Sequence, residues 1–84
     1  MDEVLEIGTV THFFSKILVA VVELTAPLSV GDPLLVKGPS TDFEMTVDSI
    51  QMEHKSIARA EGGHAIGLKM PQLARARDVV YKKL

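Results

Sequence analysis

Turn-forming residues divide this sequence into short apolar segments, and this spacing restricts the possible folds more than any other feature. Glycine, proline, aspartate and serine recur in residues 26–33, 38–42, 54–63 and 71–78. Short strands separated by turns at intervals of about 8–12 residues are typical of β-sandwiches and β-barrels. Closure into a barrel removes unpaired edge strands, which benefits so small a chain. The sequence therefore predicts an all-β fold, a small closed six-stranded β-barrel that forms one domain over residues 1–84.

Six segments have the composition of β-strands. The clearest alternation places Phe43, Met45 and Val47 on one face with polar residues between them, so these three side chains are expected to face inward. The alternation then slips by one residue, which predicts a β-bulge near Asp48 and Ser49. The predicted strands are residues 4–14, 17–24, 34–37, 43–53, 65–70 and 78–82.

Three local features have more specific interpretations. Gly8 lies inside the first predicted strand and indicates a bulge or a sharp bend. Residues 56–60 are expected to form one helical turn. Phe13 and Phe14 lie beside Lys16, where aromatic rings either close one end of the barrel or stack on an unpaired nucleic-acid base. Because the chain has only four aromatic residues, we favour the core interpretation.

The residue types needed for catalysis or cofactor binding do not occur in recognisable patterns. The sequence has no cysteine, and His12, His54 and His64 do not match the spacing of a zinc site. It contains no G-x-x-x-x-G-K-[ST] phosphate loop, and no nucleophile elbow supports a triad of Ser56, His54 and Asp78. We therefore expect a protein that is not an enzyme and uses no cofactor, metal or nucleotide.

The amino-terminal residues and the apolar runs bear on cellular location. Met1 to Val4 are acidic where a signal peptide is basic, and the apolar run from Ile17 to Val22 is too short to cross a bilayer. The absence of cysteine fits a reducing compartment. These features predict a cytoplasmic protein with no membrane partner.

Charge is distributed unevenly between the two halves of the chain. Residues 1–53 carry nine acidic and two basic side chains, whereas residues 54–84 carry two acidic and seven basic ones. One interpretation is a basic face for an anionic partner; the other is that oppositely charged strands are simply neighbours in the barrel. On the first interpretation, the residues that bind RNA or another partner are Lys55, Arg59, Lys69, Arg75 and Arg77.

The order of several motifs resembles a known family. Gly8-x-Val10 is followed by LSVGDPLLVKG at 28–38, by FEMTVDSIQMEHKSIARAEGGHAIGLKM at 43–70, and by RDVVY at 77–81. This order resembles the second, Greek-key β-barrel domain of translational GTPases such as elongation factor Tu. A stand-alone version, a small translation elongation factor-like protein, is the most similar form. Two positions depart from the family, which commonly has Gly-Asp where this chain has Gly63-His64 and Arg77-Asp78.

The resemblance implies a binding module without a GTPase domain. In that family the second domain contacts transfer RNA and the ribosome, which implies RNA, the ribosome or a translation-associated protein as the partner. A related barrel is appended to some collagenase-like peptidases. The alternative is therefore a protein-interaction module that acts beside such an enzyme.

The inward orientation of Val47 leads to a stability prediction. Val47→Asp would bury an unpaired carboxylate and should lower the free energy of unfolding by at least about 3 kcal/mol. Urea denaturation measures this change. A variant as stable as the wild type would show that Val47 does not face the core.

Overall fold

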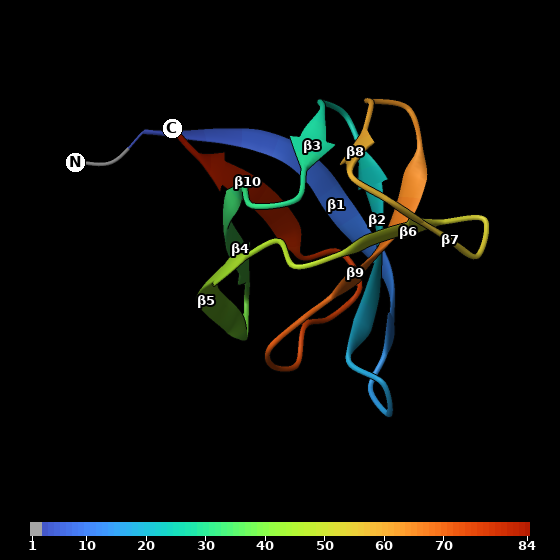
Figure 1. Ribbon diagram of the computed structural model, residues 1–84. Coiled ribbons are helices and arrows are strands. Elements are labelled where there is room, and N and C mark those ends of the chain that lie inside the picture. The colour runs from blue at the N-terminus through green and yellow to red at the C-terminus, as the bar shows by residue number, and fades with distance from the viewer. Residues whose placement is uncertain (1–2) are drawn as a thin grey trace.

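The computed structural model describes residues 3–84, and these residues form strands and turns but no helix (Figure 1). The all-β prediction is confirmed. Met1 and Asp2, part of the acidic start used to argue against a signal peptide, lie outside the described residues. Within residues 3–84 there is no helix of the length and apolarity needed to cross a membrane. The strands are β1 (Val4–Phe14), β2 (Val19–Leu24), β3 (Leu28–Ser29), β4 (Pro33–Gly38), β5 (Thr41–Thr46), β6 (Ile50–Met52), β7 (Lys55–Ile57), β8 (Arg59–Ala60), β9 (Ala65–Lys69) and β10 (Val79–Lys83).

Eight of these strands form one antiparallel sheet whose order forces it to curl. The order is β5-β4-β10-β1-β2-β9-β6-β7, while β3 and β8 pair separately. Six strand spacings separate β5 from β6, about 29 Å in a flat sheet. Residues 47–49 alone connect the two strands, and the four peptide units from Thr46 to Ile50 reach at most about 14 Å. The sheet must therefore bend round until β5 and β6 approach each other.

Several details differ from the prediction. The described residues contain ten strands rather than six, and the pairing runs from β5 to β7 without a ladder that joins the two ends. Closure of the barrel is thus not confirmed. The helical turn at residues 56–60 is wrong, because Lys55–Ile57 pairs with Ile50–Met52 and Arg59–Ala60 pairs with Leu28–Ser29. The bulge at Asp48 and Ser49 is also wrong, because residues 47–49 leave the strand altogether.

Strand β1 bends at the predicted glycine. The register between β1 and β10 shifts between Glu6 and Gly8, as expected for a β-bulge. A Cβ atom on Gly8 would lie only 2.7 Å from the carbonyl oxygen of Glu23, so this position excludes a side chain. The bend allows one long strand to pair with β10 along its first half and with β2 along most of its length.

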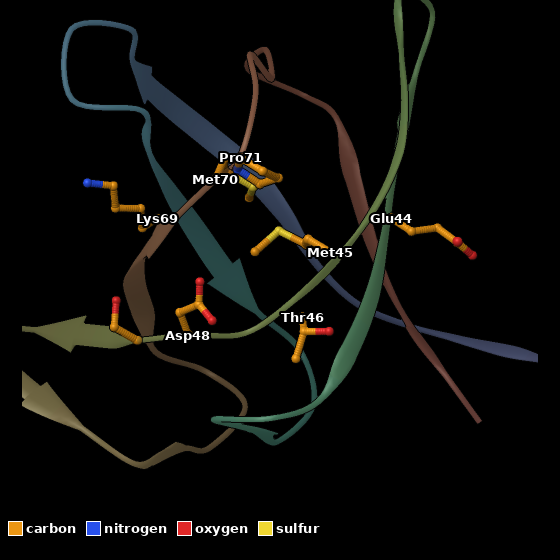
Figure 2. Close-up of a pocket in the computed structure, with 8 residues that line it drawn as sticks. Glu44, Met45, Thr46, Asp48, Lys69, Met70 and Pro71 are labelled. Carbon is orange, nitrogen blue, oxygen red and sulfur yellow. The ribbon is translucent and has the colours of Figure 1, made fainter.

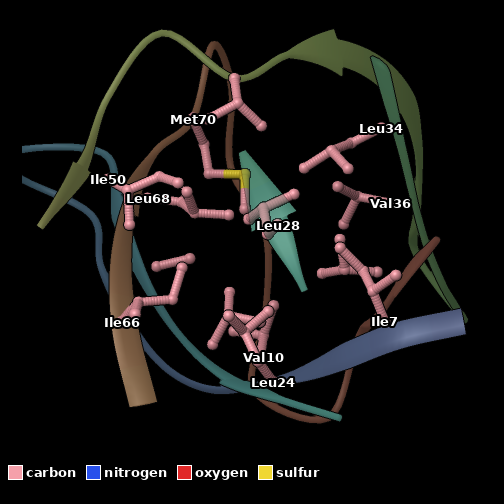
Figure 3. Packing of buried hydrophobic residues seen from close by; sticks show 14 of the residues in the cluster. Ile7, Val10, Leu24, Leu28, Leu34, Val36, Ile50, Ile66, Leu68 and Met70 are labelled. Carbon is pink, nitrogen blue, oxygen red and sulfur yellow. The ribbon is translucent and has the colours of Figure 1, made fainter. Parts of the chain in front are cut away.

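The concave side of the curled sheet holds the hydrophobic core (Figure 3). Aliphatic side chains from almost every strand meet there, among them Ile7, Leu24, Leu34, Ile66 and Leu68, each no more than 2% exposed. The core also contains Phe43 and Val47, and Met45 packs against it while remaining partly exposed, as their alternation predicted. Phe13 packs against the core, whereas Phe14 is exposed.

The turn before β10 contains a buried carboxylate in close contact with a glycine. Asp78 is 1% exposed, and its Oδ2 accepts a hydrogen bond of 2.8 Å from the backbone N–H of Arg75. Its Oδ1 lies against Gly38, where a Cβ atom would overlap it. Arg77 has a φ of 78° at one of the two positions where the resembling family commonly has glycine, so arginine adopts here a conformation that favours glycine.

The contact between Gly38 and Asp78 predicts a sharp difference between two glycine substitutions. Gly38→Ala should lower the free energy of unfolding by about 2–3 kcal/mol, because the new methyl group meets a buried carboxylate. Gly67→Ala is the matched control: its Cβ would lie 3.5 Å from Val19 Cγ1, an ordinary contact. Equal denaturation midpoints for the two variants would contradict the packing described for Asp78.

Candidate binding groove

A groove lies where the curled sheet fails to close (Figure 2). One wall is the end of β5, the second is the connection from β5 to β6, and the third is the end of β9. Its volume of about 440 Å³ falls in the range of clefts that hold small ligands. The lining residues are Glu44, Met45, Thr46, Asp48, Ser49, Lys69, Met70 and Pro71.

The side chains give this groove an apolar centre with one acidic group beside it. Figure 2 shows the thioether of Met45 reaching into the middle, with Met70 and Pro71 on the opposite side. The carboxylate of Asp48 is directed toward the same space, whereas the ammonium of Lys69 points away from it. The charge that faces the groove is therefore negative.

The backbone of β5 contributes unpaired hydrogen-bonding groups to the same wall. Val47 N–H donates to Asp32 O at 3.0 Å, and Gly31 N–H donates to Val47 O at 2.8 Å. Because backbone groups alternate in direction along a strand, the odd-numbered residues of β5 face β4, its only partner among the described strands. The N–H and C=O groups of Asp42, Glu44 and Thr46 therefore face the free edge, and two of these residues line the groove.

A smaller hollow of about 240 Å³ adjoins the groove on the outer face of the sheet. Ser49 and Lys69 line both spaces, so the two are adjacent. Gly67 lies in this hollow, on a strand between β2 and β6. It pairs with Val21 of β2 on one side and with Gln51 of β6 on the other. The missing side chain of Gly67 helps to create the hollow, because Ile66 and Leu68 point into the core instead.

The five basic residues predicted as a partner-binding face are distributed over different parts of the fold. Arg59 lies in β8, which pairs with β3, and is close to Ala65, the first residue of β9. Lys69 lies at the other end of β9, about 13 Å away along the strand. The five residues are Lys55 in the β6–β7 hairpin, Arg59 in β8, Lys69 at the end of β9, and Arg75 and Arg77 in the connection to β10.

Figure 1 shows that connection at the end of the molecule opposite β8. The structure therefore places Lys69, Arg75 and Arg77 toward one end and Arg59 toward the other. A role of any of these residues in partner binding stays a prediction.

Ion pairs account for part of the uneven charge. Lys82 Nζ lies 3.8 Å from Asp32 Oδ2, and Lys83 Nζ lies 2.6 Å from Glu44 Oε1. Both pairs join the basic end of the chain to the acidic first half, because β4 lies next to β10 in the sheet and β5 lies next to β4. Lys82 and Lys83 thus fit the interpretation of neighbouring segments of opposite charge. Arg59 instead pairs with Glu61 at 3.1 Å, two residues along the same stretch of chain.

The described residues show no cluster of side chains that could hold a metal ion. Residues 3–84 contain no group of three or more histidine, aspartate or glutamate side chains placed to hold a metal ion. His12, His54 and His64 are exposed. Asp78 is buried and accepts a hydrogen bond from the Arg75 backbone, and within residues 3–84 no side-chain hydrogen bond joins it to His54 or Ser56.

The sequence carries one signal of the groove, the slip in alternation at Asp48. The groove depends on β5 and β6 being close in the chain but far apart in the sheet order. The slip marks this change of strand, but it equally fits the predicted bulge within one continuous strand. Only pairing partners distinguish the two, and a single sequence does not show them.

Comparison with known proteins finds similarity to a segment of a protease. No family model matches the sequence. The chain is 40% identical over 78 residues to the uncharacterized protease MJ0090 of Methanocaldococcus jannaschii. The matched region covers 92% of this chain and 19% of that protein. The chain thus spans about a fifth of the relative's length.

Solved structures share the fold. The C-terminal domain of a Geobacillus thermoleovorans protein assigned to the U32 peptidases matches with a TM-score of 0.88 and 17% identity, covering 94% of this chain and 92% of that one. The selenomethionine variant of the same domain matches with a TM-score of 0.85 and 17% identity, covering 89% and 95%. At this level of identity the likeness establishes the fold alone.

These findings correct the family expected from the sequence. The resemblance to the second domain of translational GTPases, and to a small elongation factor-like protein, is wrong, because the relatives are a protease and a peptidase domain. The turns and glycines quoted for that resemblance are features of small curled β-sheets in general, and they did not distinguish the two groups.

The groove residues divide into those that support the core and those that are free for binding. Asp48→Asn and Lys69→Ala should change the free energy of unfolding by less than about 0.5 kcal/mol, because both side chains are exposed. Met70→Ala should lower it by about 2–4 kcal/mol, because Met70 is 1% exposed. If chemical denaturation shows a large loss for Asp48→Asn, the carboxylate has a structural role and is not available to a ligand.

Proposed function

We propose that this chain is a non-catalytic protein-interaction module that acts beside a peptidase, such as a collagenase-like peptidase of the U32 group. The observation that carries the proposal is the match of 92% of this chain to a 19% segment of a protease. Agreement of the fold with an isolated peptidase C-terminal domain supports it, because that domain too is a unit separate from the rest of its protein.

The chemistry of the described residues supports a role in binding rather than hydrolysis. A peptidase needs a nucleophile or an activated water, a base beside it, and donors for the oxyanion. The groove instead directs methionine side chains and the carboxylate of Asp48 into its space, beside a free strand edge. These groups suit an extended polypeptide, and the module would hold such a chain for the peptidase.

Casein, an unfolded polypeptide, tests this function with the 84-residue chain alone. Biolayer interferometry should show reversible binding of casein to the immobilised chain, and mass spectrometry should show no fragments after prolonged incubation. Fragments whose formation follows the chain through purification would show that it is an enzyme. Absence of casein binding up to about 1 mM, a binding free energy of about −4 kcal/mol, would contradict a role in holding polypeptides.

A further inference from the structure

The free edge of β5 can pair with another strand. Asp42, Glu44 and Thr46 direct their N–H and C=O groups away from β4, and no described strand meets them. An extended peptide that adds to such an edge gains main-chain hydrogen bonds, while pockets beside the edge select its side chains. The groove provides such a pocket next to Glu44 and Thr46.

The apolar centre of the groove suits a range of side chains. Met45 is partly exposed and reaches into the groove, opposite Met70 and Pro71. Methionine is flexible and polarizable, so a surface built on it adapts to different aliphatic groups. This part of the groove contributes apolar contact without requiring one particular residue.

The charges around the edge favour a cationic segment. Asp48 forms no hydrogen bond or ion pair with residues 3–84, and its carboxylate faces the groove. Asp42 and Glu44 on β5 add negative charge, although Glu44 is bound to Lys83. Of the charged side chains that Figure 2 labels, Asp48 faces the groove while Lys69 and Glu44 point away, an arrangement that favours a lysine or arginine side chain of the partner.

The same charges disfavour a second copy of this chain at the edge. If β5 of one copy paired with β5 of another, the carboxylates of Asp42 and Glu44 would face like charges, which destabilises a cross-strand pair. Charged residues on an edge strand are a common means of preventing self-association. A positively charged partner strand does not meet this repulsion from the carboxylates of β5.

We propose that the β5 edge binds an extended peptide as an added strand, with a lysine or arginine side chain of the peptide paired to Asp48. This proposal rests on the proposed function and specifies the polypeptide that the module holds. It assigns recognition to the backbone of β5, to the methionine-lined centre and to one carboxylate.

Synthetic peptides test the chemistry of the partner. The probe is a fluorescent heptapeptide of alternating threonine and valine with arginine at its centre. Replacement of this arginine by glutamate should weaken binding at least about tenfold in fluorescence anisotropy, because attraction to Asp48 becomes repulsion. Equal affinity of the two peptides would overturn the assignment of a cationic side chain.

N-methylation distinguishes edge pairing from other modes of binding. Two isomers carry methyl groups on the amides of alternate residues, one set on each edge of the extended peptide. Only one edge of the peptide faces β5. One isomer should therefore bind at least about tenfold more weakly than the unmethylated peptide, while the other isomer should bind with the same affinity as that peptide. Equal affinity of the two isomers would overturn the strand-addition mode.

Matched variants of the protein locate the site. Asp48→Asn should weaken the arginine peptide about three- to tenfold, whereas Glu23→Gln, which removes the same charge from the exposed face of β2, should change affinity less than about twofold. Thr46→Pro removes an outward-facing N–H from an edge strand, where proline is tolerated, and should abolish binding in a protein that remains folded by circular dichroism. Unchanged binding in both groove variants would place the site elsewhere.

The outcomes separate this inference from the proposed function. If casein binds with the same affinity to the wild type, Asp48→Asn and Thr46→Pro, the module holds polypeptides and the β5 edge is not the site. If neither casein nor the arginine peptide binds, the proposed function fails together with the inference. A concentration-dependent dimer in sedimentation that disappears in Thr46→Pro would show that a second copy occupies the edge, and it would overturn the inference alone.

Discussion

The three-residue connection between β5 and β6 is the constraint on which the rest of the structure depends. It joins strands that the sheet order separates by five others, so the sheet has to curl. Curling produces a concave face, and the aliphatic residues of β1, β2, β4, β9 and β10 fill it. Val47 anchors the connection, because its side chain is in the core and its backbone bonds to Gly31 and Asp32.

The same connection explains where the structure stays open. The backbone hydrogen bonds of Val47 hold the β5–β6 connection against the turn that precedes β4. Beyond that point β5 has no neighbour other than β4 among the described strands, and its end faces the last residues of β9 across the groove. The groove is therefore a consequence of how the sheet curls, since the connection brings β5 and β6 close without pairing them.

The sequence predicted the strands better than their partners. β1 matches its predicted range from Val4 to Phe14, and the bulge at Gly8 was predictable because a glycine inside a strand usually marks a bulge, a bend or a close backbone approach. Phe43 and Val47 were predicted to be buried because alternation reports which face of a strand is covered. By contrast, pairing between strands that are distant in sequence depends on contacts that a local pattern does not encode. For this reason β3, β7 and β8 were missed, β6 was predicted as part of the strand at residues 43–53, and the helical turn at residues 56–60 was wrong.

The candidate site was harder to predict than the fold. The basic residues were grouped because they lie close in sequence, but the chain reverses direction at every turn. Arg59 in β8 therefore lies near the start of β9, and Lys69 lies at its end. The groove depends on a free edge and on the side-chain directions of Met45 and Asp48, which follow only from the sheet order. The family was misassigned for a related reason, because the motifs that suggested it are turn geometries that several small β-domains share.

The openness of the β5 edge is the central claim, and amide hydrogen exchange measured by NMR tests it most directly. If the edge is free, the amides of Asp42, Glu44 and Thr46 exchange much faster than those of Phe43 and Met45, whose N–H groups face β4. This alternation should not appear in β10, which pairs with β1 on one side and with β4 on the other. Equal protection of all five amides would show that β5 has a partner on both sides. The free edge of β5 and the groove beside it would then not exist in solution.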